Sequence, residues 1–102
     1  MFGMFNQAPQ IECPEARHMV QNDGAQLVDV RTPAEHAQGT LPGAVNVPLN
    51  LIHHGHQQLD KSKPVIVYCA SGGRSAQAKN ILHSLGFDNV HNLGSLHKYL
   101  SC

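Results

Sequence analysis

The stretch VIVYCASGGRSAQAKNILHSLG, residues 65–86, places a cysteine between a strand pattern and a helix pattern. Residues 65–68 are apolar or aromatic, and Cys69 follows them directly. In an open α/β sheet, ligands bind in the crevice at the carboxyl ends of the strands. The thiol of Cys69 is therefore expected at the mouth of such a crevice.

The residues after Cys69 can direct positive potential at its sulfur. Gly72 and Gly73 allow the backbone to curl so that successive N–H groups point inward. The next helix adds the positive end of its dipole, and Arg74 adds a full charge. Such surroundings lower the pKa of a cysteine, and the thiolate is the nucleophile, so the loop is predicted to bind an oxyanion and attack it. The alternative, that Cys69 is a small buried hydrophobe, does not explain the glycines and the arginine.

Strand and helix patterns alternate along the chain. One helix is predicted from Pro14 to Asn22, and another begins at the capping pair Thr32 and Glu35 and ends at Gly39. Further helices are predicted in part of the segment after Pro48, at residues 78–85, where apolar residues share one face, and at residues 96–100. Strands are predicted at residues 10–12, 27–30, 44–47, 65–68 and 89–91. This alternation indicates an α/β fold with a mostly parallel sheet covered on both faces.

Composition limits the classes of partner. A chain of 102 residues is expected to be one domain, 1–102, with residues 1–9 flexible. Seven basic and seven acidic side chains balance, which argues against nucleic-acid and membrane partners. Three cysteines without regular spacing suggest no disulfide framework, and the start lacks a secretory signal pattern. A reducing, cytoplasmic location is the expectation.

Two segments together resemble the single-domain rhodanese family of thiosulfate sulfurtransferases. They are LVDVRTPAEHAQGTLPGAVNVPL, residues 27–49, and CASGGRS, residues 69–75. The resemblance implies a rhodanese-like α/β fold, with a five-stranded parallel sheet of order 3-2-4-5-1 and helices on both faces. It also implies a reaction without a metal or organic cofactor.

By the same resemblance, the Cys69 thiolate takes the outer sulfur of thiosulfate or of a persulfide donor and holds it as a persulfide. A thiol or cyanide then accepts the sulfur. The implied partners are a small sulfur-containing anion and a thiol acceptor, with a thioredoxin-like protein as one candidate, and the chain is expected to be a monomer. Arg74 is expected to support the loop or to steer the donor. Inward N–H groups of the other loop residues are expected to bind the substrate, namely Ala70, Ser71, Gly72, Gly73 and Ser75.

Two alternatives use the same cysteine. Cysteine-dependent phosphatases generally enclose five residues between the cysteine and the arginine, whereas Cys69 and Arg74 enclose four, as in sulfurtransferases. A phosphatase or arsenate-reductase-like activity therefore ranks second. A sulfur carrier or binding module without catalysis is the third hypothesis.

Other polar residues are given structural roles. Asp29, Arg31 and Glu35 are predicted to form a buried charge network that ties the second strand to the next helix, because buried charges must be paired. His53, His54 and His56 are expected to face solvent rather than to bind a metal. The remaining cysteines, at positions 13 and 102, are expected to be bystanders.

Overall fold

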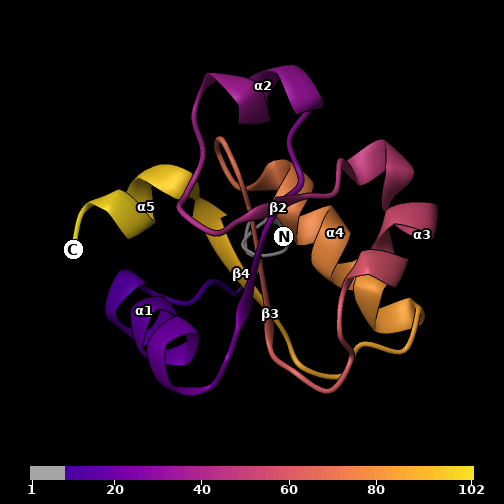
Figure 1. Ribbon diagram of the computed structural model, residues 1–102, viewed down its shortest axis with the longest axis horizontal. Coiled ribbons are helices and arrows are strands. Elements are labelled where there is room, and N and C mark those ends of the chain that lie inside the picture. Colours follow the sequence, from indigo (N-terminus) through magenta and orange to yellow (C-terminus); the bar gives the residue numbers. More distant parts are fainter. Residues whose placement is uncertain (1–8) are drawn as a thin grey trace, which may run out of the picture.

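Four parallel strands form the centre of the protein (Figure 1). The computed structural model describes residues 9–102. Neighbouring strands lie in the order β2-β1-β3-β4, and all three pairs are parallel. The strands are β1 (Gln26–Asp29), β2 (Val45–Asn46), β3 (Val65–Cys69) and β4 (Val90–Ser95). The α/β class with a parallel sheet, predicted from the alternating patterns, is confirmed.

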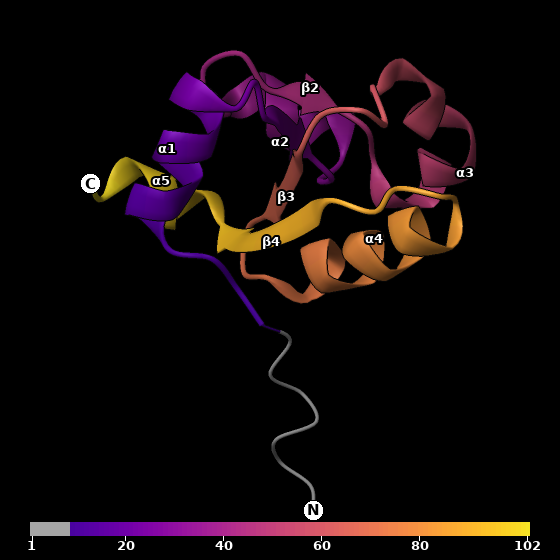
Figure 2. The same cartoon turned by 90° about the horizontal axis from the view of Figure 1, so that it is seen from below.

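Helices cover both faces of this sheet (Figure 2). Helices α1 and α5 pack on one face, where Ile66 and Tyr68 of β3 point into their core. Helices α3 and α4 cover the other face, against Val65 and Val67. The helices are α1 (Cys13–Asn22), α2 (Pro33–Gln38), α3 (Ile52–Gly55), α4 (Gly73–Ser84) and α5 (Leu96–Leu100), with short 3-10 turns η2 (Leu49–Leu51) and η3 (His56–Gln58) beside α3.

The predicted strand at residues 10–12 is wrong: the sheet has four strands in the described part of the chain, not five. Only the N–H of Ile11 reaches the neighbouring edge, where it donates to the carbonyl of Asn92 at 2.9 Å. Within residues 9–102, no strand precedes helix α1, which begins at Cys13. The other four strands keep the expected order. Of the stretch 1–9 predicted to be flexible, residues 1–8 lie outside the described part.

A β-bulge interrupts the pairing of β3 with β4. Val67 pairs with Asn92, but Tyr68 pairs with Gly94, so Leu93 is an extra residue in β4. Gly94 takes a φ of +90°, which glycine tolerates without steric cost. Beyond the bulge, β4 runs directly into α5, and Ser95 both ends the strand and caps the helix.

The expectation for the outer cysteines is also wrong, because Cys13 and Cys102 form a disulfide with their Cα atoms 6.1 Å apart. They are 89 positions apart in the sequence, and only the packing of α1 against α5 brings them together. Cys69 remains a free thiol. The argument for a reducing compartment assumed unpaired cysteines and loses that support. None of the helices in residues 9–102 has the length and apolar character needed to cross a bilayer.

Candidate active site

Strand β3 carries Cys69 to the carboxyl edge of the sheet. All five residues of β3 are buried, as expected for a central strand that is apolar on both faces. Cys69 is the last residue of the strand and is 0% exposed. Helix α4 begins four residues later, at Gly73, so residues 70–72 form the turn between strand and helix.

Hydrogen-bond donors converge on the sulfur of Cys69. The N–H of Gly72 donates to Sγ at 2.9 Å. The Cys69 thiol itself donates to the Ser75 hydroxyl at 3.5 Å, and that hydroxyl donates to the Gly72 carbonyl at 3.0 Å. Burial by itself raises the pKa of the Cys69 thiol. Hydrogen bonding with the Ser75 side chain and with the N–H groups of Ser75, Gly72 and Ser71 outweighs this effect, so the pKa of Cys69 lies below its ordinary value. The Cys69 thiol therefore ionises more readily than an ordinary cysteine.

Gly72 holds the turn in a conformation that few other residues adopt. It is the cap residue of α4 and has a φ of +112°. The side chain of Gln10 packs closely over Gly72 and Gly94. A Cβ added at Gly94 would lie only 2.5 Å from Oε1 of Gln10. Gln10, which precedes α1, therefore packs against the turn, and no local sequence pattern predicts this contact.

Arg74 is bound by Glu35 of helix α2. Its Nη1 and Nη2 donate to the two carboxylate oxygens at 2.6 Å and 3.0 Å. Thr32 orients Glu35 through the predicted capping box, in which the Thr32 N–H donates to Oε1 at 3.0 Å. The Arg74 guanidinium and the Thr32 N–H lower the pKa of Glu35 to about 2. Arg74 therefore faces a carboxylate that stays ionised at working pH.

Asp29 and Arg31 form a separate, buried charge pair. Nε and Nη2 of Arg31 donate to the two oxygens of Asp29 at 2.9 Å and 2.8 Å. His36 Nδ1 and Thr40 Oγ1 also reach the Asp29 carboxylate, at 3.0 Å and 2.9 Å. Glu35 does not share this network, contrary to the expectation, because its side chain points from α2 toward the start of α4.

A pocket of about 370 Å³ opens beside the cysteine loop. Ala70 of the loop lines it, together with Glu35 of α2. Its third wall comes from α5, which contributes Leu96, His97 and Leu100. No sequence pattern links α5 to the loop, so sequence reasoning missed these residues. The pocket gives a small molecule a place beside the cysteine loop.

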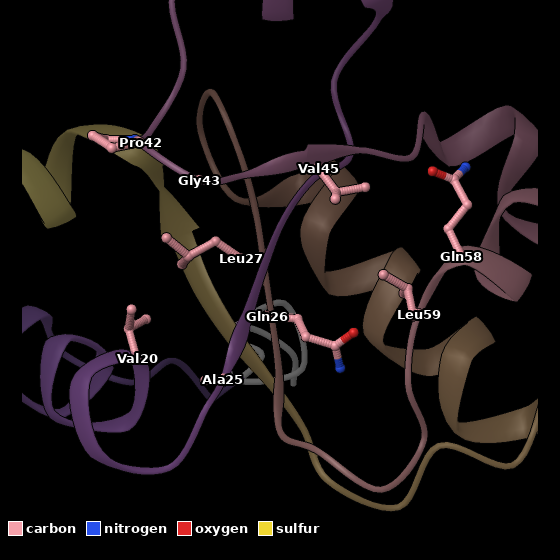
Figure 3. Close-up of a pocket in the computed structure, with 9 residues that line it drawn as sticks. All are labelled: Val20, Ala25, Gln26, Leu27, Pro42, Gly43, Val45, Gln58 and Leu59. Atoms are coloured by element: carbon pink, nitrogen blue, oxygen red, sulfur yellow. The ribbon is translucent and has the colours of Figure 1, made fainter.

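Another pocket, of about 290 Å³, lies at the other end of β1 (Figure 3). Its lining comes from the start of β1, the loop before β2, α1 and η3, and includes Gln26, Leu27 and Leu59. Its side chains are apolar or amides, without a nucleophile. His53 and His54 are exposed, as expected, whereas His56 is half-buried and its ring lies edge-on to that of Phe87. No group of three metal-ligating side chains occurs within residues 9–102.

Comparisons with known proteins agree in one family. A model of the rhodanese-like domain matches residues 12–102. A sulfurtransferase of Allochromatium vinosum is 40% identical over 78 residues, which cover 76% of this chain and 73% of that protein. Human thiosulfate:glutathione sulfurtransferase is 30% identical over 105 residues, which cover 89% and 91%.

A solved structure agrees with this assignment. That of the human single-domain sulfurtransferase TSTD1 matches with a TM-score of 0.74 at 30% identity, covering 92% of this chain and 96% of that one. The family match over most of the chain, the relatives and the shared fold lead to one conclusion. The chain belongs to the rhodanese family of sulfurtransferases.

Proposed function

We propose that the protein transfers sulfane sulfur from thiosulfate or a persulfide donor to a thiol acceptor, through a persulfide on Cys69. The supporting observation is the sulfur of Cys69, which accepts the Gly72 N–H at 2.9 Å and lies beside the Ser75 hydroxyl. These donors favour the thiolate, which is the reactive form. One relative is named a thiosulfate:glutathione sulfurtransferase, which supports thiosulfate as one donor and a thiol as the acceptor.

In the first step, the Cys69 thiolate attacks the outer sulfur of thiosulfate. A new S–S bond forms to Cys69, the S–S bond of thiosulfate breaks, and its electron pair leaves with sulfite. The transferred sulfur carries one negative charge. Inward N–H groups of the turn, with the Ser75 hydroxyl, stabilise this charge as they stabilised the thiolate.

In the second step, an acceptor thiolate attacks the outer sulfur of the persulfide. The bond between that sulfur and Cys69 breaks, and its electron pair returns to Cys69 as thiolate. The donors that lower the pKa of Cys69 make it a good leaving group. Cyanide can take the place of the thiol in an assay. The pocket beside Ala70 is the approach route in this proposal.

Mass spectrometry tests the proposal directly. Incubation with thiosulfate should add the mass of one sulfur to the wild type, and a thiol acceptor should remove it. Cys69→Ser should gain no sulfur, whereas Cys102→Ser, which retains Cys69, should gain it as the wild type does. An unmodified wild type, or addition that persists in Cys69→Ser, would contradict the proposal.

The same preparations distinguish the alternatives. Hydrolysis of an aryl phosphate that depends on Cys69 and exceeds sulfur transfer would favour a phosphatase. Persulfide formation without transfer to any acceptor would favour a sulfur carrier.

The predicted monomer, thioredoxin-like acceptor and cytoplasmic location remain part of the proposal. A cytoplasmic location requires that Cys13 and Cys102 be reduced in the cell, because disulfides persist mainly in oxidising compartments. To test this, cells are treated rapidly with an alkylating agent and the alkylated cysteines of the protein are counted. Alkylation of Cys13 and Cys102 would show that the pair is reduced.

A further inference from the structure

The two arginines near the site, Arg31 and Arg74, are each paired with a carboxylate. Arg31 holds both oxygens of Asp29, and Arg74 holds both oxygens of Glu35. Arg31 and Glu35 line the pocket beside Ala70, and Arg74, which is paired with Glu35, lines another pocket near Pro48. The guanidinium groups therefore add little net positive charge for an incoming anion.

The two pairs differ in exposure. The side chains of Arg31 and Asp29 are 9% and 0% exposed, so this pair is a fixed part of the core. Those of Arg74 and Glu35 are 37% and 32% exposed, so their charges act on the pocket mouth. Without Glu35, Arg74 would present a full positive charge there. The carboxylate of Glu35 therefore weakens the attraction for a dianion more than for a monoanion.

The wall contributed by α5 favours an organic group. Leu96 and Leu100 line the pocket beside Ala70, and Leu100 is 59% exposed. An exposed leucine at a pocket mouth offers apolar contact to a ligand. The sulfonate part of thiosulfate carries only oxygens and gains nothing from this wall.

Resting on the sulfurtransferase function proposed above, we propose that Glu35 sets the donor specificity of Cys69. The preferred donors are monoanions with an organic substituent, namely organic persulfides and thiosulfonates, rather than dianionic thiosulfate. Glu35 acts by cancelling the charge of Arg74, and the α5 wall contacts the organic group.

Methanethiosulfonate and thiosulfate form a suitable pair of probes, because a methyl group in one replaces a charged oxygen in the other. The Cys69 thiolate attacks the outer sulfur of methanethiosulfonate and forms the same persulfide. The S–S bond of the donor breaks, and its electron pair leaves with methanesulfinate instead of sulfite. The two reactions differ in the charge of the donor and in its methyl group.

The experiment measures kcat/KM for both donors at low ionic strength, where charge effects are least screened. Glu35→Gln keeps an acceptor for the capping box, since glutamine also serves at that position. The ratio of kcat/KM for thiosulfate to kcat/KM for methanethiosulfonate should rise about five- to tenfold in this variant. The control Asp88→Asn removes one negative charge from the exposed turn before β4, at the opposite end of the sheet, and should leave the ratio unchanged.

Two further variants complete a charge series. Arg74→Gln leaves the Glu35 carboxylate unopposed and should lower the ratio below that of the wild type. The double variant Glu35→Gln/Arg74→Gln restores a neutral pair and should return the ratio toward the wild-type value. The series remains informative if one single variant fails to fold.

A ratio that does not follow the charge of the pair overturns the inference, even if both donors persulfidate Cys69. A ratio that moves equally in Asp88→Asn also overturns it, because the effect would then come from total charge. If neither donor adds sulfur to wild-type Cys69, the proposed function itself fails. The mass of the protein shows whether sulfur is added, and the ratio of kcat/KM values shows whether Glu35 sets the donor preference.

Discussion

Replacing Cys102 by serine opens a covalent ring that spans nearly the whole described chain. The disulfide joins positions 89 residues apart. In the chain-entropy treatment, closing a ring of about 90 residues restricts the unfolded chain by about 4 to 5 kcal/mol. Measured effects of removing native disulfides are commonly about 2 to 4 kcal/mol. The ring therefore represents a large share of the stability of a small domain.

The native contacts of α5 should survive this change. Nη2 of Arg17 donates to the Tyr99 carbonyl at 2.8 Å, and its guanidinium lies 4.2 Å from the centre of the Tyr99 ring. Nζ of Lys98 donates to the Ile11 carbonyl at 2.8 Å. Because these contacts hold α5 on α1 without the disulfide, Cys102→Ser should fold. Its melting temperature should fall by about 10 °C or more.

Urea unfolding with and without reductant is the assay. Reductant should lower the midpoint of the wild type to about that of Cys102→Ser and should leave Cys102→Ser itself unchanged. Cys69→Ser keeps both ring cysteines and should show the full shift, which excludes the free thiol as its cause. Equal midpoints for oxidised and reduced wild type, with thiol counting showing the pair open, would refute the reasoning.

Two other predictions concern the cysteine turn. Ser75→Ala removes a hydroxyl 3.5 Å from Sγ of Cys69 and should raise the pKa of that thiol. Its alkylation by iodoacetamide at pH 7 should slow about three- to tenfold, with an unchanged rate at high pH; an unshifted pH profile would contradict this. Gly72→Ala forces a side chain onto a φ of +112° and places a Cβ 3.1 Å from Gln10 Nε2, so urea unfolding should show a loss of about 1 to 2 kcal/mol. Gly73→Ala, with no atom within 4 Å of its Cβ, is the control and should lose nothing.

Local patterns predicted the elements that local chemistry determines. Residues 65–68 read as a central strand because they are β-branched or aromatic, and they form the buried β3. Thr32 and Glu35 have the spacing of a capping box, and both of its hydrogen bonds are present. Because the strand pattern stops at Cys69 and a helix pattern follows, the sequence also predicts that the turn before α4 lies at the end of this strand.

Contacts between distant segments were not predictable from the sequence. Residues 10–12 do not form a strand, because the hydrogen bond from Ile11 to Asn92 does not continue into a ladder with β4, and the sequence does not show this pairing. Arg74 and Glu35 are 39 residues apart, and only the packing of α2 near the start of α4 brings them together. The Cys13–Cys102 bond depends in the same way on two helices at opposite ends of the chain.

The extra residue at Leu93 makes the length of β4 as important as its composition. Because Tyr68 pairs with Gly94 rather than with Leu93, every later residue is advanced by one position relative to β3. A deletion of Leu93 would restore regular pairing and keep Ser95 opposite Cys69, but it would remove a fully buried side chain from the core between the sheet and helices α1 and α5. A bulge also bends its strand, so its loss would change the direction in which α5, which follows β4 without a linker, leaves the sheet. Substitutions along β4 should therefore accumulate more readily during evolution than insertions or deletions.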